Sequence, residues 1–502
     1  MASALAKQLQ QLREAGAGSK RRTDTFLYDQ REASRLDNET VYNLAWNGLL
    51  ELKQLDAKFE ELDNDVAVSK LFSRERIHFH RTQSLKKDEI ELNAALDKIL
   101  DALSAYFLLS ATHKVLEFLV RRYEVHRYNI DAIMAMIIAY HESGWFVRMV
   151  RILHIHETRW EFLLPVKTQG TPLLRVALVQ RVIDEPSVIE FVFNAATRIG
   201  ARNSKLTSLY TLIVLQILEQ SRVTEQKMRW LVPQLLTALH STNFPELQSS
   251  AYMIVTKLAS KATLTVKVVD TLVKALVKFA QSGAQMNALL CVIFLAQTQP
   301  SFRLSNTAGK YLVHMENAAD VLRDATMNYE SAKFVQILTV FLIENMESTD
   351  DDHFRLLTSL IENVSVVDEF TDELVETMVT QAQELAFAMN NARVQAISQG
   401  LVALSKKNAT QVDGMISRLL SKQTKKSKQD KKLNQFLTNT FENVANSAHF
   451  VPSNTDANTS LTLALDHPTE HIRYEALVLL AKMNDTNAEM TTTGKVRDTY
   501  KR

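Results

Sequence analysis

Hydrophobic positions recur along most of this chain with the period of an amphipathic α-helix. The clearest stretch is 461–483, LTLALDHPTEHIRYEALVLLAKM. Pro468 stands there at a first helical position, where its missing N–H costs nothing, and Arg473 falls on the polar side. The apolar face is formed by Ile472, Ala476, Leu479, Leu480 and Met483. This spacing predicts a helix that begins at Pro468 and buries one side against a neighbour.

The same order of residue types occurs twice more. A hydrophobic and then a polar residue are followed four positions later by a small residue and then by an aliphatic pair, from Leu247 to Leu258 and, more weakly, from Val394 to Val402. A small residue in mid-helix lets a second helix approach, so we expect Ala251 and Ala476 to face helix–helix interfaces. The pattern resembles the second helix of a HEAT repeat. It predicts an all-α fold, an α-solenoid of HEAT-like helical hairpins.

The scarcity of glycine and proline supports this fold class. The 502 residues include 11 Gly and 8 Pro, under half of the roughly 12% that average usage would give. Sheets with tight hairpins depend on Asn-Gly and Asp-Gly turns, and the one Asp-Gly pair, Asp413-Gly414, lies inside a helical pattern. We therefore expect essentially no strand.

Breaks in the periodicity predict the domain organisation. Local signals include helix starts at Thr171-Pro172 and Asn203-Ser204, a helix stop at Gly200, and a tight turn over 165–171. The predicted regions are an amphipathic segment with a basic linker at 1–36, a helical domain at 37–200, a HEAT-like array at 201–420, a basic loop at 421–432, further HEAT-like repeats at 433–484 and a polar tail at 485–502. A solenoid needs a polar terminal repeat, so the strongly repeat-like helix near the end leads us to expect the N-terminal piece of a longer chain.

Charge is balanced overall and uneven locally. The formal net charge is +1, but residues 342–376 carry a net charge of −10, residues 421–432 carry +5 and residues 1–22 carry +4. The lysine run at 421–432 is interpreted either as a contact to RNA phosphates or a nuclear-import signal, or equally well as a solvated loop without a specific partner. The acidic stretch is interpreted as solvated helix faces. The candidate contacts to RNA or to an acidic partner are Lys20, Arg21, Arg22, Lys422, Lys425, Lys426, Lys428, Lys431 and Lys432.

The sequence contains no recognisable catalytic, phosphate-binding or metal-binding motif. It contains no glycine-rich phosphate loop and no nucleophile elbow. The single cysteine, Cys291, has aliphatic flanks that indicate a buried thiol. His154 and His156 stand two residues apart, which does not suit a shared metal on a helix. The longest apolar runs have about half of the ~20 residues that a bilayer requires. We therefore predict a non-enzyme with no cofactor, metal, membrane or small-molecule site.

Several long strings carry a resemblance to a known family. They are FLYD at 26–29, AYFLL at 105–109, LEFLVRRYEVHRYN at 116–129, YHE at 140–142, FVRMVRIL at 146–153 and RWEFLLPVKTQGTPL at 159–173. Together with the start MASALAKQLQQL, they resemble the N-terminal region of the HEAT-repeat-containing protein 1 family, the large solenoid subunits associated with the U-three small nucleolar ribonucleoprotein. The match covers roughly the first third of the chain.

The resemblance implies a nucleolar role in the small-subunit processome. It implies a part in pre-rRNA transcription and in processing toward small-subunit rRNA, with other processome subunits, WD40 propeller proteins and pre-rRNA as partners. It supplies no catalytic residues. The first hypothesis is therefore a scaffold in the nucleus and nucleolus, and the alternative is an α-solenoid adaptor or transport receptor that carries a protein cargo. Armadillo-type carriers line their groove with Trp and Asn one turn apart, a pairing absent after Trp46, Trp145, Trp160 and Trp230.

Overall fold

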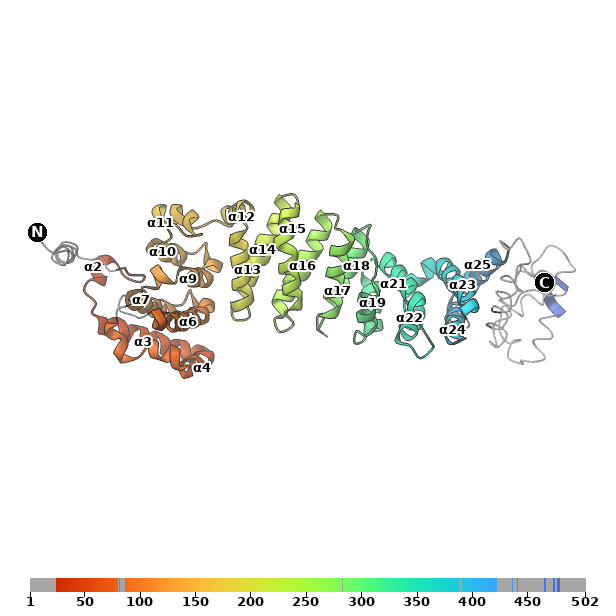
Figure 1. Ribbon diagram of the computed structural model, residues 1–502, viewed down its shortest axis with the longest axis horizontal. Coiled ribbons are helices and arrows are strands. Elements are labelled where there is room, and N and C mark those ends of the chain that lie inside the picture. The colour runs from red at the N-terminus through yellow and green to blue at the C-terminus, as the bar shows by residue number, and fades with distance from the viewer. Residues whose placement is uncertain are drawn as a thin grey trace, which may run out of the picture. The chain divides into compact units, whose positions relative to one another are not determined.

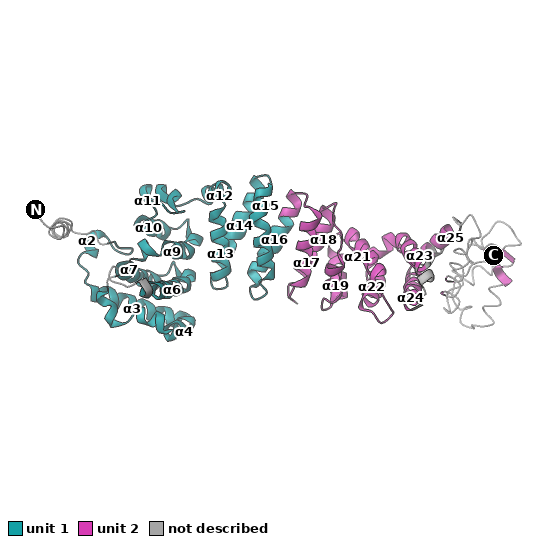
Figure 2. Cartoon of the chain, in the orientation of Figure 1, with its two compact units in different colours: residues 1–257 teal, residues 258–502 magenta. Residues whose placement is uncertain are grey.

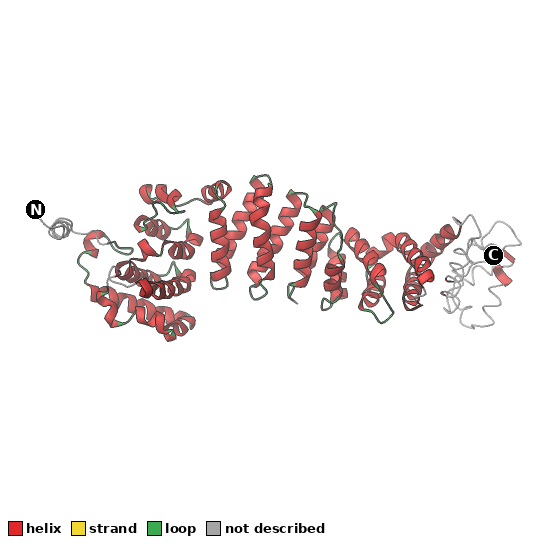
Figure 3. Ribbon diagram, in the orientation of Figure 1, coloured by secondary structure: helices red, strands yellow, loops and turns green. Residues whose placement is uncertain are grey.

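The computed structural model confirms the all-α prediction. It describes residues 24–79, 81, 86–281, 283–388 and 391–421, together with isolated positions at 436, 440, 465, 473–474 and 476–478. None of these residues lies in a strand, and helices connected by short turns account for nearly all of them (Figure 3). Among the same residues, no helix combines the length and the apolar character that a membrane span requires. The fold class is an all-α solenoid.

The chain divides into two compact units, residues 1–257 and 258–502 (Figure 2). The finer division expected from the sequence, with boundaries at 36, 200, 420, 432 and 484, stays a prediction. Most of the last three predicted regions lies outside the described residues.

Unit 1 begins with short, closely packed helices before it becomes regular. Its elements are α2 Gln30–Ala33, α3 Asn38–Leu55, α4 Lys58–Asn64, α5 Val66–Leu71, η1 Arg74–His78, α6 Lys86–Leu103, η3 Ser104–Tyr106, α7 Ser110–Tyr123, α8 Val125–Tyr128, α9 Ile130–Ile137, η4 Ile138–Tyr140, α10 Gly144–Ile152, η5 Glu161–Leu163, α11 Leu164–Gln169, α12 Arg175–Asp184, α13 Ser187–Ile199, α14 Ser204–Gln220, α15 Glu225–His240 and α16 Pro245–Lys261 (Figure 1). The last turn of α16 continues into unit 2.

The pairing of α3 with α7 forms the centre of the first part of unit 1. Asp37 caps α3 by accepting a hydrogen bond from the amide of Thr40 at 2.9 Å. Gly48 lets the two helices touch, because a Cβ there would lie 2.5 Å from the carbonyl oxygen of Ala111. The hydroxyls of Tyr42 and Tyr123 donate to the backbone at the end of α5, to Phe72 and Leu71 respectively. Buried aromatic rings and their polar ends therefore fix this packing.

Helices α13 to α16 show the hairpin pattern that the sequence predicts. Asn203 caps α14 through the amide of Lys205, and Gly200 ends α13. Ala251 on α16 is 1% exposed, as is Ala476, which is also helical. Both small residues are thus buried as expected.

Two local predictions around residue 170 are wrong. Residues 164–169 form α11 and not a turn, and Thr171-Pro172 does not start a helix, since α12 begins at Arg175. Residues 171–174 stay extended because Leu173 is paired with His141. Its amide donates to the His141 carbonyl at 3.2 Å, and its carbonyl accepts from His141 Nδ1 at 2.7 Å. Gly170 ends α11 in the left-handed region, with φ of 72°, a conformation that glycine adopts without strain.

Unit 2 is a succession of hairpins. Its elements are α17 Val266–Lys278, α18 Gln285–Thr298, α19 Asn306–Val313, α20 Ala318–Asn328, α21 Ala332–Asn345, α22 Asp352–Asn363, η6 Ser365–Phe370, α23 Thr371–Ala388, α24 Asn391–Lys407 and α25 Ala409–Ser421. Each packs mainly on elements one to three places away in the chain, such as α17 on α18 and α19, or α23 on α24 and α25. Packing restricted to sequence neighbours is the defining property of a solenoid.

Buried amide side chains link elements that lie far apart in the sequence. In unit 2, Gln299 at the end of α18 donates through Nε2 to the carbonyls of Ala259 and Ala262, and its Oε1 accepts from the amide of Leu264 at 2.7 Å. Asn408 donates to Asp368 Oδ1 and to Thr371 Oγ1. In unit 1, Asn203 reaches the carbonyl and hydroxyl of Ser104. These side chains replace backbone hydrogen bonds that helix ends would otherwise lack.

Candidate functional site

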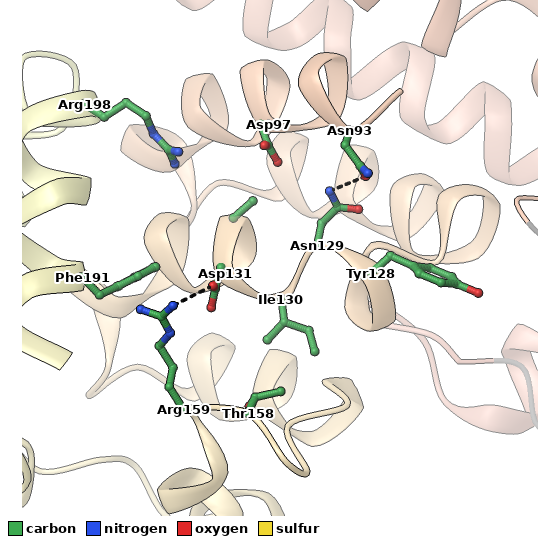
Figure 4. Close-up of a pocket in the computed structure, with 11 residues that line it drawn as sticks. Asn93, Asp97, Tyr128, Asn129, Ile130, Asp131, Thr158, Arg159, Phe191 and Arg198 are labelled. Carbon is green, nitrogen blue, oxygen red and sulfur yellow. Dashed lines mark hydrogen bonds and ion pairs between the residues drawn. The ribbon is translucent and has the colours of Figure 1, made fainter. Parts of the chain in front are cut away.

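Unit 1 contains a cleft of about 600 Å³ between α6, the α8–α9 junction, the segment after α10, and α13 (Figure 4). Its lining is mostly polar and mixes both charges. The residues that define it are Asn93, Asp97, Tyr128, Asn129, Asp131, Thr158, Arg159, Phe191 and Arg198. The cleft therefore depends on the tertiary fold, which brings these four parts of the chain together.

A buried arginine organises one wall of the cleft. Arg81 is 3% exposed and donates to the carbonyl of Tyr123 at 2.8 Å and to Asn129 Oδ1 at 2.7 Å. It also contacts Asn93, whose Oδ1 accepts from Asn129 Nδ2 at 2.9 Å. The guanidinium lies 4.4 Å from the centre of the Tyr128 ring, and burial lowers its pKa. This network holds the α8–α9 junction against α6.

Two carboxylates lie one turn apart on α6, and one of them, Asp97, lines the cleft. Asp101 accepts from Arg198 at 2.9 Å. Burial raises the pKa of Asp101 to about 6, against the opposing effect of Arg198. Burial also raises the pKa of Asp97, one turn earlier. Raised carboxyl pKa values occur in catalytic acids. Here the raised pKa belongs to a carboxyl group that forms an ion pair linking α6 to α13.

The opposite wall explains part of the RWEFLLP string. The indole of the buried Trp160 donates to Asp131 Oδ1 at 2.7 Å. Its ring meets Phe191 edge to face at 4.8 Å. Arg159 pairs with the other oxygen of Asp131 at 3.5 Å, as Figure 4 shows. These residues anchor the non-helical segment between α10 and η5 onto α9 and α13, so their role in the structure is packing.

A second cluster joins Asp24, His126 and His154, whose ligand-type atoms lie within 4.8 Å of one another. Two imidazoles and a carboxylate are a donor set that zinc accepts. However, Asp24 already receives a hydrogen bond from Arg127 at 2.8 Å and one from His126 Nε2 at 3.0 Å. Burial lowers the pKa of His126 and of His154, and nearby cations lower that of His154 further. The Asp24 carboxylate is thus already held by two side chains of α8, and we call this link between residue 24 and the helices the clasp. The expected absence of a metal stays a prediction.

The clasp continues into the FLYD string. Glu117 on α7 is 1% exposed and accepts from Thr25 Oγ1 at 2.7 Å and from the amides of Phe26 and Leu27 at 2.8 Å. Arg121 supplies its counter-charge. Phe26 is fully buried and contacts the rings of Phe107, His113 and Trp145. Residues 24–28 are thereby fixed to α7, and the sequence reasoning missed this role for Glu117. An acidic residue inside the apolar run VLEFLV was the available signal.

The cysteine and the two histidines singled out from the sequence lie outside the cleft lining. Burial raises the pKa of the Cys291 thiol to about 12, so it is a buried thiol as expected. His154 and His156 lie outside helices, so the helix-face argument did not apply to them. All nine candidate contact residues, which are Lys20, Arg21, Arg22, Lys422, Lys425, Lys426, Lys428, Lys431 and Lys432, lie outside the described residues.

Comparison with known proteins identifies relatives of this chain. The fold defines an α-helical repeat protein. The family model described as U3 small nucleolar RNA-associated protein 10 matches residues 227–342. Human HEAT repeat-containing protein 1 is 25% identical over 520 residues, which cover 97% of this chain and 24% of the human protein.

Other relatives give the same result. The HEAT repeat-containing protein 1 homolog of Dictyostelium discoideum is 28% identical over 78% of this chain and 17% of its own length. The U3 small nucleolar RNA-associated protein 10 of Emericella nidulans is 26% identical over 76% of this chain and 22% of its own length. The resemblance predicted from the sequence is thus confirmed and extends over most of the chain. The chain spans about a quarter or less of the length of these relatives.

Proposed function

We propose that this chain is a non-catalytic scaffold region of the nucleolar small-subunit processome. In this role it supports pre-rRNA transcription and processing toward small-subunit rRNA. The observation that carries the proposal is the similarity of 97% of the chain to human HEAT repeat-containing protein 1. The match of residues 227–342 to a family named for U3 small nucleolar RNA supports it. These names favour a scaffold over the alternative, a transport receptor with a protein cargo.

The architecture suits a scaffold because a stack of hairpins presents many side chains without needing a pocket. Several large apolar side chains remain on its surface. Leu212 on α14 is 45% exposed and Met253 on α16 is 51% exposed. The two helices are joined nearby by the hydroxyls of Thr211 and Ser250. Exposed apolar residues on linked helices are suited to protein contact, and several such contacts along one chain add avidity.

The proposed partners are other processome subunits, among them WD40 propeller proteins, with pre-rRNA and the small nucleolar ribonucleoprotein reached within the same assembly. The proposed location is the nucleolus. Protein contacts carry most of the binding in this proposal, because the net charge of +1 gives the whole chain little general attraction to RNA.

The proposal is tested by purifying the tagged 502-residue chain from nucleolar extract before and after ribonuclease treatment, at a low and a moderate salt concentration. We expect other processome subunits to be recovered in all four samples, since apolar contacts survive both treatments. Loss of every subunit after ribonuclease would show that RNA tethers this region and would refute a protein-based scaffold.

A matched pair of variants sharpens the test. Leu212→Glu with Met253→Glu places charge on the apolar surface of α14 and α16. Ile90→Glu with Met327→Glu changes two side chains that are 73% and 70% exposed elsewhere. We expect the first pair to reduce recovery of the subunits and the second to leave it unchanged. Equal recovery with both pairs would exclude the α14–α16 surface as a contact.

A further inference from the structure

The start of unit 2 is strongly basic, a feature that the overall charge balance conceals. Residues 258–315 contain six basic residues and a single acidic one, Asp270. The basic residues are Lys261, Lys267, Lys274, Lys278, Arg303 and Lys310. Most of this segment folds as α17, α18 and α19. Its charge is therefore held on packed helices, unlike the basic run at 421–432.

Three of the lysines form one stripe on α17. Lys267, Lys274 and Lys278 are separated by seven and four residues, which places them on the same side of a helix. The opposite side is the buried one, with Val269, Leu272 and Leu276. Lys274 pairs with Asp270 at 2.7 Å. Lys267 and Lys278 are exposed, and within the described part of the chain no carboxylate lies at ion-pair distance from either.

Helix α19 packs on α17 and continues the charged surface. The Lys278 ammonium lies 5.6 Å from the centre of the Tyr311 ring, and Tyr311 is 41% exposed. Its neighbour Lys310 is also exposed. Just after α19, His314 Nε2 lies 3.9 Å from Asp352, one of the acidic residues of 342–376. The α17–α19 surface, defined as Lys267, Lys274, Lys278, Lys310 and Tyr311, is therefore bounded by negative charge.

From this geometry we infer that the α17–α19 surface binds single-stranded RNA through its phosphate backbone. Lysines supply point charges for phosphates, and the exposed Tyr311 ring beside Lys278 supplies a face for a base. Charge tracks with interspersed aromatic rings are the usual device of single-strand binding. The surface also lies within residues 227–342, the part that matches the U3-associated family model. The inference deepens the proposed function, on which it rests, by assigning the RNA contact to a particular surface.

The test measures binding of a fluorescent oligouridylate of about 20 nucleotides, longer than a usual single-strand site, to the full 502-residue chain as a function of salt. The variant is the triple Lys267→Gln, Lys278→Gln and Lys310→Gln. Each phosphate contact on a single strand contributes a slope of about −0.7 to log K against log salt. We therefore expect the triple variant to lose about 2 units of slope and, at ~0.1 M salt, roughly 100-fold in affinity. Tyr311→Leu should lose roughly tenfold, with its slope unchanged.

Two controls separate this surface from general charge. The triple Lys58→Gln, Lys70→Gln and Arg175→Gln removes the same charge from exposed positions in unit 1, and we expect it to bind as the unaltered chain does. Lys→Arg at the three surface positions should retain binding, which shows that the surface still folds. An equal loss in both Gln triples, or none in either, would overturn the inference.

Further outcomes distinguish the ligand. Equal binding of duplex RNA with no effect of Tyr311→Leu would overturn the single-stranded assignment. Displacement of the RNA by polyglutamate at equal charge would instead indicate an acidic protein partner and overturn the assignment to RNA. Recovery of processome subunits with the Lys→Gln triple separates the two proposals. If subunits are recovered while RNA affinity is unchanged, only this inference fails. If RNA affinity falls but no subunits are recovered even with the unaltered chain, only the proposed function fails.

Discussion

Glu117 gives the sharpest test of the packing in unit 1. Its carboxylate is 1% exposed and accepts hydrogen bonds from one hydroxyl and two backbone amides of residues 25–27. Its partner Arg121 has a side chain that is 7% exposed. Replacing Glu117 with Ala leaves two amides without an acceptor and one buried guanidinium without a counter-charge. Hydrogen bonds to a charged group contribute about 1.5–3 kcal/mol each.

We expect Glu117→Ala to destabilise unit 1 by about 3–5 kcal/mol, the usual cost of breaking a buried ion pair from one side. At roughly 2–4 °C for each kcal/mol in a unit of this size, the midpoint of thermal unfolding of unit 1 should fall by about 6–20 °C. Glu117→Gln keeps an acceptor oxygen, so its unfolding midpoint should lie between those of the unaltered chain and Glu117→Ala. The measurement is circular dichroism on heating, with hydrogen exchange of the amides of Phe26 and Leu27 as the local readout.

The matched control is Glu51→Ala. Glu51 is 46% exposed and pairs with Lys114 at 2.6 Å, so its loss should cost about 0–1 kcal/mol. If Glu117→Ala unfolds at the same temperature as Glu51→Ala and leaves the two amides protected, residues 24–28 are not fastened by Glu117. The account of the clasp would then be wrong.

Three further predictions concern packing and pH. Gly309→Ala should destabilise unit 2 by ~1–3 kcal/mol, because a Cβ would lie 2.1 Å from the Phe341 ring. Gly414→Ala, with nothing within 4 Å, should be neutral or stabilising, and equal midpoints of thermal unfolding for the two would contradict this packing. Ala251→Leu should cost roughly 1–3 kcal/mol by overpacking a 1% exposed position on α16, and an unchanged denaturation midpoint would show that the position tolerates volume. Because burial raises the pKa of Asp101 to about 6, the folded state binds a proton more tightly than the unfolded state, and stability falls as pH rises from about 4 to 6. The loss relative to Asp101→Asn should reach at most ~3 kcal/mol, and parallel pH profiles for the two chains would refute the shift.

Helical periodicity was enough to predict the fold class, and local signals placed two helix ends correctly. Asn203 and Gly200 act where their local chemistry places them, because a cap depends on residues within one turn. Thr171-Pro172 carries the same kind of signal and fails. Its segment is held extended by hydrogen bonds to His141, which is about 30 residues away in the sequence. A local pattern cannot report a partner that only the tertiary fold brings close.

The same limit applies to the sites. Glu117 and the amides that it binds are about 90 residues apart, so spacing along the chain gave no indication of their contact. The basic surface was missed for a different reason. Its lysines are spread over 267–310 among many apolar residues, whereas only uninterrupted runs such as 421–432 stand out in local charge. Helical spacing within α17 was the signal that could have found it.

The amides of Gln299, Asn203 and Asn408 have a consequence for how this protein can be rearranged. Each one recognises specific backbone or hydroxyl groups on an earlier hairpin, at a distance in sequence of 35 to 99 residues. A hairpin that carries such an amide therefore packs correctly only against the hairpin that supplies its hydrogen-bond partners. Hairpins with similar apolar faces are therefore not interchangeable here, and moving one to another place in the series would bury an unpaired amide at each new boundary. These polar contacts determine the order of the hairpins, whereas the hydrophobic faces determine only that the hairpins stack.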